Sequence, residues 1–154
     1  MSDSQAYIVM KTEISTAVNY CGRMFKGPYE DTPQFMEQLQ KELIKAEVAY
    51  EAFNTLSIYP DDPAEKAPEQ LQSFHGIKVK APVSHNPELE NRSLPVGHYL
   101  HYGTIEPGLI WFAFEVVHNQ AQAEGIALAD VPPLLVTTFI NGQVQFNYYF
   151  PLKD

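Results

Sequence analysis

Gly27-Pro28-Tyr29-Glu30-Asp31 separates a β-like segment of the chain from its first long amphipathic helix. Gly27-Pro28 ends the predicted strand at 18–25, because proline lacks the N–H group that a sheet requires. Thr32 can then cap a helix with Pro33 at its first position, where a missing N–H costs nothing. This stretch therefore predicts a strand, a turn and a helix in that order.

The predicted helix has one apolar face, because Phe35, Leu39 and Leu43 recur at helical spacing. A polar segment at 60–71 follows it and predicts an ordered surface loop, in which Asp62 caps a helical turn that begins at Pro63. Strands are predicted before and after the helix, the first two joined by a tight connection. Their ranges are 7–14, 18–25, 54–59 and 74–80.

A similar order of elements recurs in the second half of the chain. Tyr20 and Tyr99 are 79 residues apart, as are Pro28 and Pro107, so strand and turn superpose without a gap. The second helix, at about 109–124, matches the apolar face of the first at an offset of 78, and Gly125 is placed to end it. Strands are predicted at 91–94, 98–105, 134–140 and 144–150, with the last two joined at Asn141-Gly142.

Two such units of strand, strand, helix, strand and strand predict an α+β fold. The 154 residues suit a single domain, 1–154, made of a first unit at 5–82 and a second at 89–152. Proline, serine, histidine and asparagine cluster at the join between them.

The charge and hydropathy of the chain exclude several classes of function. Ten Lys and Arg against nineteen Asp and Glu give a net charge of -9, which repels a phosphate backbone and predicts no direct nucleic-acid binding. No apolar run approaches the roughly 20 residues that span a bilayer, so a soluble, cytoplasmic protein without a membrane partner is expected. A protein, a neutral ligand or a cationic ligand remains as partner.

Metal and nucleophilic chemistry have little support in the sequence. The histidines do not form a metal pattern, and His98 and His101, three apart in a strand, point to opposite faces. Cys21 is expected to be a small buried hydrophobe, and neither a Gly-x-Ser-x-Gly elbow nor a glycine-rich phosphate loop occurs. No cofactor and no metal are expected. The histidines are His75, His85, His98, His101 and His118.

Several motifs in order resemble the GyrI-like, or bacterial transcription-activator effector-binding, family of small-molecule-binding domains. The resemblance covers nearly the whole chain, and the pairing of Asp-Asp-Pro with Pro-Glu-x-Leu is its most specific part. The motifs are Gly27-Pro28-Tyr29-Glu30, Tyr59-Pro60-Asp61-Asp62-Pro63 with Pro68-Glu69-x-Leu71, Leu94-Pro95-x-Gly97-x-Tyr99, and Tyr149-Phe150-Pro151-Leu152.

This resemblance implies two pseudo-symmetric βαββ units whose curved antiparallel sheet surrounds a central cleft, with one long helix per unit on the outer side. Members of the family bind hydrophobic, often cationic, drugs as sensory domains of regulators. The expected function is a stand-alone domain that binds a hydrophobic small molecule, for sensing or sequestering. The alternatives are a protein-binding inhibitor of the DNA gyrase-inhibitor type and a hydrolase of cyclopropane-bearing toxins.

The last strand departs from the family at one position. Its alternation predicts that Tyr148 and Phe150 pack under a helix while Asn147 and Tyr149 face the cleft. In the family, a glutamate four residues before the closing proline, here Pro151, pairs with cationic ligands or acts in hydrolysis. An amide at that position can only exchange hydrogen bonds, which argues against tight cation binding and against an enzyme. Simple sheet packing is the alternative role for Asn147.

Aromatic residues supply the remaining candidates for a ligand site. Trp111 is predicted either to face a pocket or partner, or to fold over the edge of the core. Nearby, Glu115 could replace the missing carboxylate only if its helix turned toward the cleft. Tyrosine rings could line a cleft for flat apolar ligands, although for any single tyrosine the role of an ordinary sheet residue is favoured. The candidates are Tyr20, Tyr29, Tyr59, Tyr99, Tyr102 and Tyr149.

Overall fold

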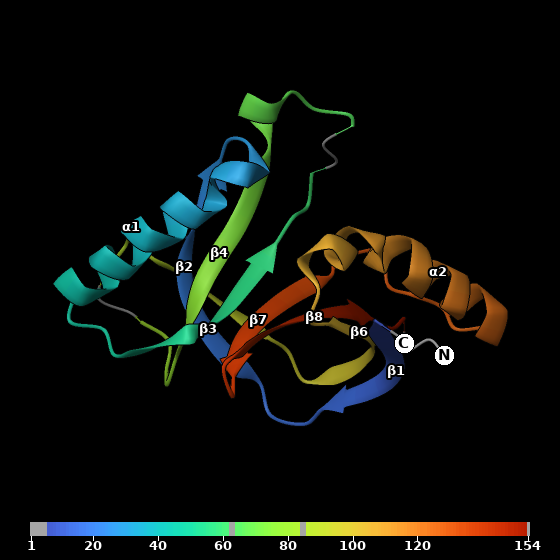
Figure 1. Ribbon diagram of the computed structural model, residues 1–154. Helices are drawn as coiled ribbons and strands as arrows, with labels where there is room; N and C mark the ends of the chain where they lie inside the picture. Colours follow the sequence, from blue (N-terminus) through green and yellow to red (C-terminus); the bar gives the residue numbers. More distant parts are fainter. Residues whose placement is uncertain (1–5, 62–63, 84–85, 154) are drawn as a thin grey trace. The chain divides into compact units, whose positions relative to one another are not determined.

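The computed structural model describes residues 6–61, 64–83 and 86–153, and its architecture is α+β with antiparallel strands (Figure 1). The chain forms two compact units. The middle unit is Ala17–Leu94, and the terminal unit comprises the residues up to Thr16 together with those from Pro95 onward. Each unit carries one long helix on a sheet of four strands, as the fold class predicted from the sequence requires.

In the middle unit, the strands lie in the order β3-β4-β2-β5, with each neighbouring pair antiparallel. The helix α1 lies against β2 and β4, and Figure 1 shows it running along one face of these strands. The bounds are β2 Val18–Lys26, η1 Tyr29–Asp31, α1 Thr32–Lys45, β3 Tyr50–Ile58, η2 Pro68–Gln70, β4 Gln72–Val79 and β5 Glu90–Leu94.

The core of the middle unit confirms the apolar face predicted for α1. Phe35, Leu39 and Leu43 are its buried residues, and Leu39 and Leu43 pack with Cys21 of β2 and Ile77 of β4. Removing these side chains from water is the main favourable contribution to folding, worth about 1.5 to 3 kcal/mol for each fully buried aliphatic or aromatic residue. The helix is therefore held on the sheet by its buried stripe.

The turn at 27–31 is fixed by contacts with the loop that follows β3. Gly27 has φ +147°, a conformation that favours glycine, and its N–H donates to the carbonyl of Leu71 over 2.8 Å. The Tyr29 hydroxyl donates to the carbonyl of Asp61 over 2.9 Å. The Thr32 hydroxyl donates to the Tyr29 carbonyl, so it does not cap the helix as predicted. The predicted cap at 62 and 63 lies outside the described residues.

In the terminal unit, the strands lie in the order β1-β6-β8-β7, again antiparallel. The buried residues of α2 are Ala113, Val117 and Ala121, each 78 positions after a buried residue of α1, so the predicted offset of the helices is confirmed. The bounds are β1 Tyr7–Ile14, β6 Gly97–Thr104, η3 Pro107–Phe112, α2 Ala113–Glu124, β7 Leu134–Ile140 and β8 Gln143–Pro151.

Two turn residues of the terminal unit adopt the conformations expected from the sequence. Gly125 ends α2 in the left-handed region, with φ 68° and ψ 30°. Asn141 and Gly142 have φ 53° and 78° between β7 and β8, and positive φ at both positions is the mark of the hairpin turn that Asn-Gly favours. In the described part of the chain, no helix is long and apolar enough to cross a membrane.

The start of the second helix and the position of β1 differ from expectation. Residues 107–112 form a 3-10 segment, so α2 begins only at Ala113. The strand β1 pairs with β6 and not with β2, although only 15–17 separate it from β2. The strand β5 pairs in turn with β2. The predicted repeat ranges, 5–82 and 89–152, remain a prediction and differ from the two compact units.

Candidate functional site

The candidate site lies on the face of β6 and β8 opposite α2. On the α2 face, Tyr148 and Phe150 are buried, and their ring centroids lie 5.8 and 5.4 Å from that of Phe114 in α2. Asn147 and Tyr149 alternate with them and therefore point to the opposite face. The two-sided pattern predicted for the last strand is confirmed within this unit.

Asn147 and Tyr149 meet at His101, a residue of the neighbouring strand β6. The register places His101 opposite Tyr149 and Gly103 opposite Asn147. The His101 Nε2 atom lies 2.8 Å from Asn147 Oδ1, and the His101 ring stacks on Tyr149 with centroids 4.7 Å apart and an angle of 9° between the planes. A third ring, that of Tyr99, contacts Tyr149 edge-on at 5.7 Å.

These polar groups are held in their neutral forms. An amide oxygen can only accept a hydrogen bond, so His101 Nε2 carries the proton that it donates to Asn147. Burial lowers the pKa of His101, although the bond to Asn147 opposes this shift. Burial likewise raises the pKa of the Tyr149 phenol. At neutral pH the cluster of His101, Asn147 and Tyr149 therefore presents polar atoms without a net charge.

A surface hollow of about 270 Å³ adjoins this cluster. Gly103 lies beneath it, where an added Cβ would come within 3.3 Å of both Asn147 Oδ1 and Ile8 Cγ1. A side chain at this position would crowd the amide, so glycine keeps the space above β6 open. The lining residues are Ala6, Tyr7, Ile8, Gly103, Thr104, Ile105, Gln145 and Asn147.

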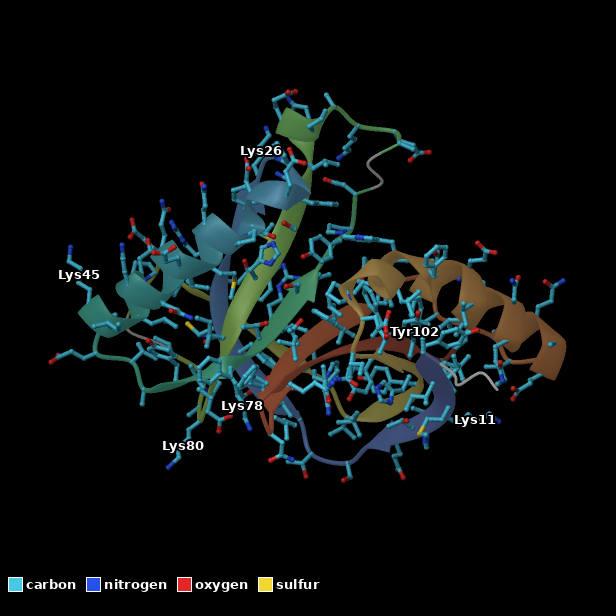
Figure 2. The ribbon with its side chains drawn as sticks, viewed as in Figure 1. Lys11, Lys26, Lys45, Lys78, Lys80 and Tyr102 are labelled. Carbon is cyan, nitrogen blue, oxygen red and sulfur yellow. The ribbon has the colours of Figure 1, made fainter. Side chains whose placement is uncertain are left out.

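The other predicted site residues of the terminal unit lie elsewhere in it. Tyr102 is buried on the α2 side, where its hydroxyl donates to the carbonyl of Leu109 over 2.7 Å and its ring stacks on Tyr7 at 5.2 Å; Figure 2 shows it within the unit. Trp111 belongs to η3 and is 58% exposed. Glu115 lies on the exposed side of α2. Ligand contact by Tyr102 or Trp111 remains a prediction.

The predicted tyrosines of the middle unit form structural contacts there. Tyr20 is buried and donates to Asn54 Oδ1 over 2.8 Å. Tyr29 and Tyr59 meet edge-on with centroids 4.7 Å apart, which joins two of the motifs that carry the family resemblance. Burial raises the pKa of Tyr59. Their roles in ligand binding also remain predictions.

Sequence reasoning missed His101 and Gly103 as parts of the site. His101 was considered only as a metal ligand, and among the described residues no group of three or more His, Cys, Asp and Glu could hold a metal ion. Both residues can be recognised only when the register of β6 against β8 is known, since that register pairs His101 with Tyr149 and Gly103 with Asn147. The alternation of β6 places His101 and Gly103 on one face of the strand, but it does not show which residues of β8 lie beside them.

Comparison with solved structures gives the class of fold. The crystal structure of the EcmrR C-terminal domain superposes with a TM-score of 0.74 at 12% identity, covering 97% of this chain and 99% of that chain. In the complex of EcmrR with DNA, this chain spans only 58% of the EcmrR chain. The protein thus has the GyrI-like fold that the sequence motifs predicted.

Two further structures share this fold at lower similarity. SAV2435 bound to tetraphenylphosphonium has a TM-score of 0.55 at 10% identity, covering 95% of this chain and 94% of that chain. A hydrolase from Listeria innocua has a TM-score of 0.56 at 10% identity, covering 99% of this chain and 94% of that chain. No family model and no curated protein matches the sequence.

Proposed function

We propose that this protein is a small-molecule-binding domain that holds a hydrophobic ligand beside Asn147, for sensing or sequestering. The observation that carries this proposal is the neutral cluster of His101, Asn147 and Tyr149 next to an open hollow. Ligand sites are typically apolar and aromatic with a few polar groups that fix orientation. The cluster and the hollow together have this character.

The fold supports the same proposal. The EcmrR C-terminal domain has this fold, and SAV2435 is a protein of the same fold with tetraphenylphosphonium bound. By the resemblance of the sequence motifs, Asn147 takes the position in the last strand where the GyrI-like family carries an acidic residue. With no carboxylate there, ligand binding without hydrolysis is the favoured activity. The net charge of -9 disfavours direct contact with nucleic acid, while a protein partner is compatible with it.

Thermal unfolding with a panel of hydrophobic, aromatic compounds tests this function. A ligand that binds the folded state raises its stability by RT ln(1 + [L]/Kd), about 2.7 kcal/mol when its concentration is 100 times Kd. We expect a dose-dependent rise in Tm with several compounds, and a Kd by calorimetry for the best of them. The proposal would be contradicted if no compound of the panel changed Tm at concentrations up to its solubility limit.

Matched variants locate the binding. Tyr149→Ala removes the ring that stacks on His101, so His101 is no longer held against Asn147, and the variant is expected to bind the best ligand about tenfold more weakly. Phe112→Ala removes an exposed aromatic ring elsewhere in the same unit and is the control. Equal losses in both variants, or a loss in Phe112→Ala alone, would place the ligand at a different surface.

A further inference from the structure

The Asn147 amide is held in one orientation. Its Oδ1 atom accepts the hydrogen bond from His101 Nε2, and because the amide is planar, its Nδ2 group points away from His101. The strands place His101 on one side of Asn147, while Gln145 and Ile105 of the hollow lie on the other. Among the described residues, the side chain of Asn147 has no second hydrogen-bond partner.

Besides Asn147, the polar side chains that line the hollow are those of Tyr7, Thr104 and Gln145. The Thr104 hydroxyl donates to the Ala6 carbonyl over 2.8 Å and accepts from the N–H of Glu106. Among the residues that the structure describes, no carboxylate lines the hollow. A cation placed here would lose water without gaining an opposite charge, whereas a neutral acceptor would gain the two Nδ2 hydrogens of Asn147.

We propose that the ligand is a hydrophobic molecule bearing a hydrogen-bond acceptor, and that His101 selects it by turning the Asn147 Nδ2 group toward the hollow. This inference rests on the proposed function, and it makes His101 a positioning residue that need not touch the ligand. Ile8 and Ile105 supply apolar walls for the body of the ligand. Gly103 leaves the room that the fixed amide and the ligand require.

Two probes that differ mainly in polarity separate this selection from general hydrophobic binding. Tetraphenylphosphonium and triphenylphosphine oxide both carry phenyl rings on phosphorus, but the first is a cation and the second is a neutral, strong acceptor. For the natural protein, calorimetry should give a Kd for the oxide at least about tenfold lower than for the cation, the usual effect of one well-placed hydrogen bond.

Asn147→Asp nearly preserves the shape of the side chain but replaces its donors by acceptors. This variant is expected to lose the preference for the oxide and to bind the cation more tightly than the natural protein does. His101→Leu frees the amide to rotate, so the Kd for the cation divided by the Kd for the oxide should fall toward one. His101→Gln can still donate an N–H toward Asn147 Oδ1 and should retain most of the preference. Circular dichroism and Tm verify that each variant is folded.

Each outcome tests a different part of the proposal. If the natural protein binds the cation as tightly as the oxide, or if Asn147→Asp leaves the ratio unchanged, the acceptor selection is wrong while small-molecule binding stands. If His101→Leu keeps the ratio of the natural protein, the positioning role of His101 is wrong. If neither probe nor any compound of the panel binds, the proposed function itself fails and this inference fails with it.

Discussion

At the scale of single residues, His75 shows how burial fixes a protonation state. It is buried between two serines, with Ser57 Oγ 2.9 Å from Nδ1 and Ser73 Oγ 2.8 Å from Nε2. The rings of Phe35 and Tyr59 contact it edge-on at 5.8 and 5.5 Å. Burial lowers the pKa of His75 from 6.5 to about 4.

This shift predicts a loss of stability in acid. Between pH 6.5 and about 4, the unfolded chain binds a proton at His75 that the folded chain does not. The free energy of unfolding therefore falls as the pH is lowered through this range, by up to ~3 kcal/mol from this group. Urea denaturation at pH 7 and at pH 4.5 measures the difference.

Two glutamine variants isolate the contribution of His75. His75→Gln keeps a hydrogen-bonding side chain but cannot titrate, so the fall in stability between the two pH values should be smaller than in the natural protein. His118→Gln changes a histidine on the exposed side of α2 and should keep the natural fall. The same fall in all three proteins would show that other groups cause the acid sensitivity.

Individual residues of the site could be predicted only where the two-residue period of a strand assigns them to a face of the sheet. The two-residue period of a strand separates Asn147 and Tyr149 from Tyr148 and Phe150, and the structure has this separation. His101 could not be predicted, because which residue lies opposite Tyr149 depends on strand register. Register is determined by the packing of the whole sheet and leaves no local signal in β6.

At the scale of elements, the ends of helices and hairpins were predictable because their chemistry is local. Gly125 and Asn141-Gly142 have the positive φ values that their residue types suggest. The 3-10 segment at 107–112 was not predicted, since its continuous apolar run at 109–112 does not distinguish a 3-10 segment from the first turn of an α-helix. The tight turn after β1 suggested a hairpin, but 15–17 lead the chain from one compact unit into the other.

Gly125 and Gly108 form a matched pair for testing the end of α2. Gly125 has φ 68°, so Gly125→Ala should lower the free energy of unfolding by about 1 kcal/mol. Gly108 is in the 3-10 segment without a positive φ, and an added Cβ there meets no atom within 4 Å. Gly108→Ala should therefore be neutral or slightly stabilising. Chemical denaturation of both variants makes the comparison, and equal destabilisation would contradict it.

At the scale of the whole molecule, the chain can be divided in two ways. The sequence repeat places β1 with β2 in 5–82, whereas the compact middle unit takes β5 in place of β1. The strand β5 pairs with β2 from Val18 to Gly22, and Leu89 just before it is buried in the core around Leu39 and Leu43. The middle unit is also continuous in sequence, so it can be produced as a single fragment.

Two fragments distinguish these divisions. The fragment 17–94 contains β2, α1, β3, β4 and β5 with their shared core, and it should unfold cooperatively with protected amides in β2 and β4. The fragment 5–82 lacks β5 and Leu89 and carries β1 without its partner β6, so it should be less stable and aggregate more readily through the exposed edge of β2. Circular dichroism melts and hydrogen exchange on both fragments measure this. Greater stability of 5–82 would show that the sequence repeat, and not the compact unit, is the folding unit of this protein.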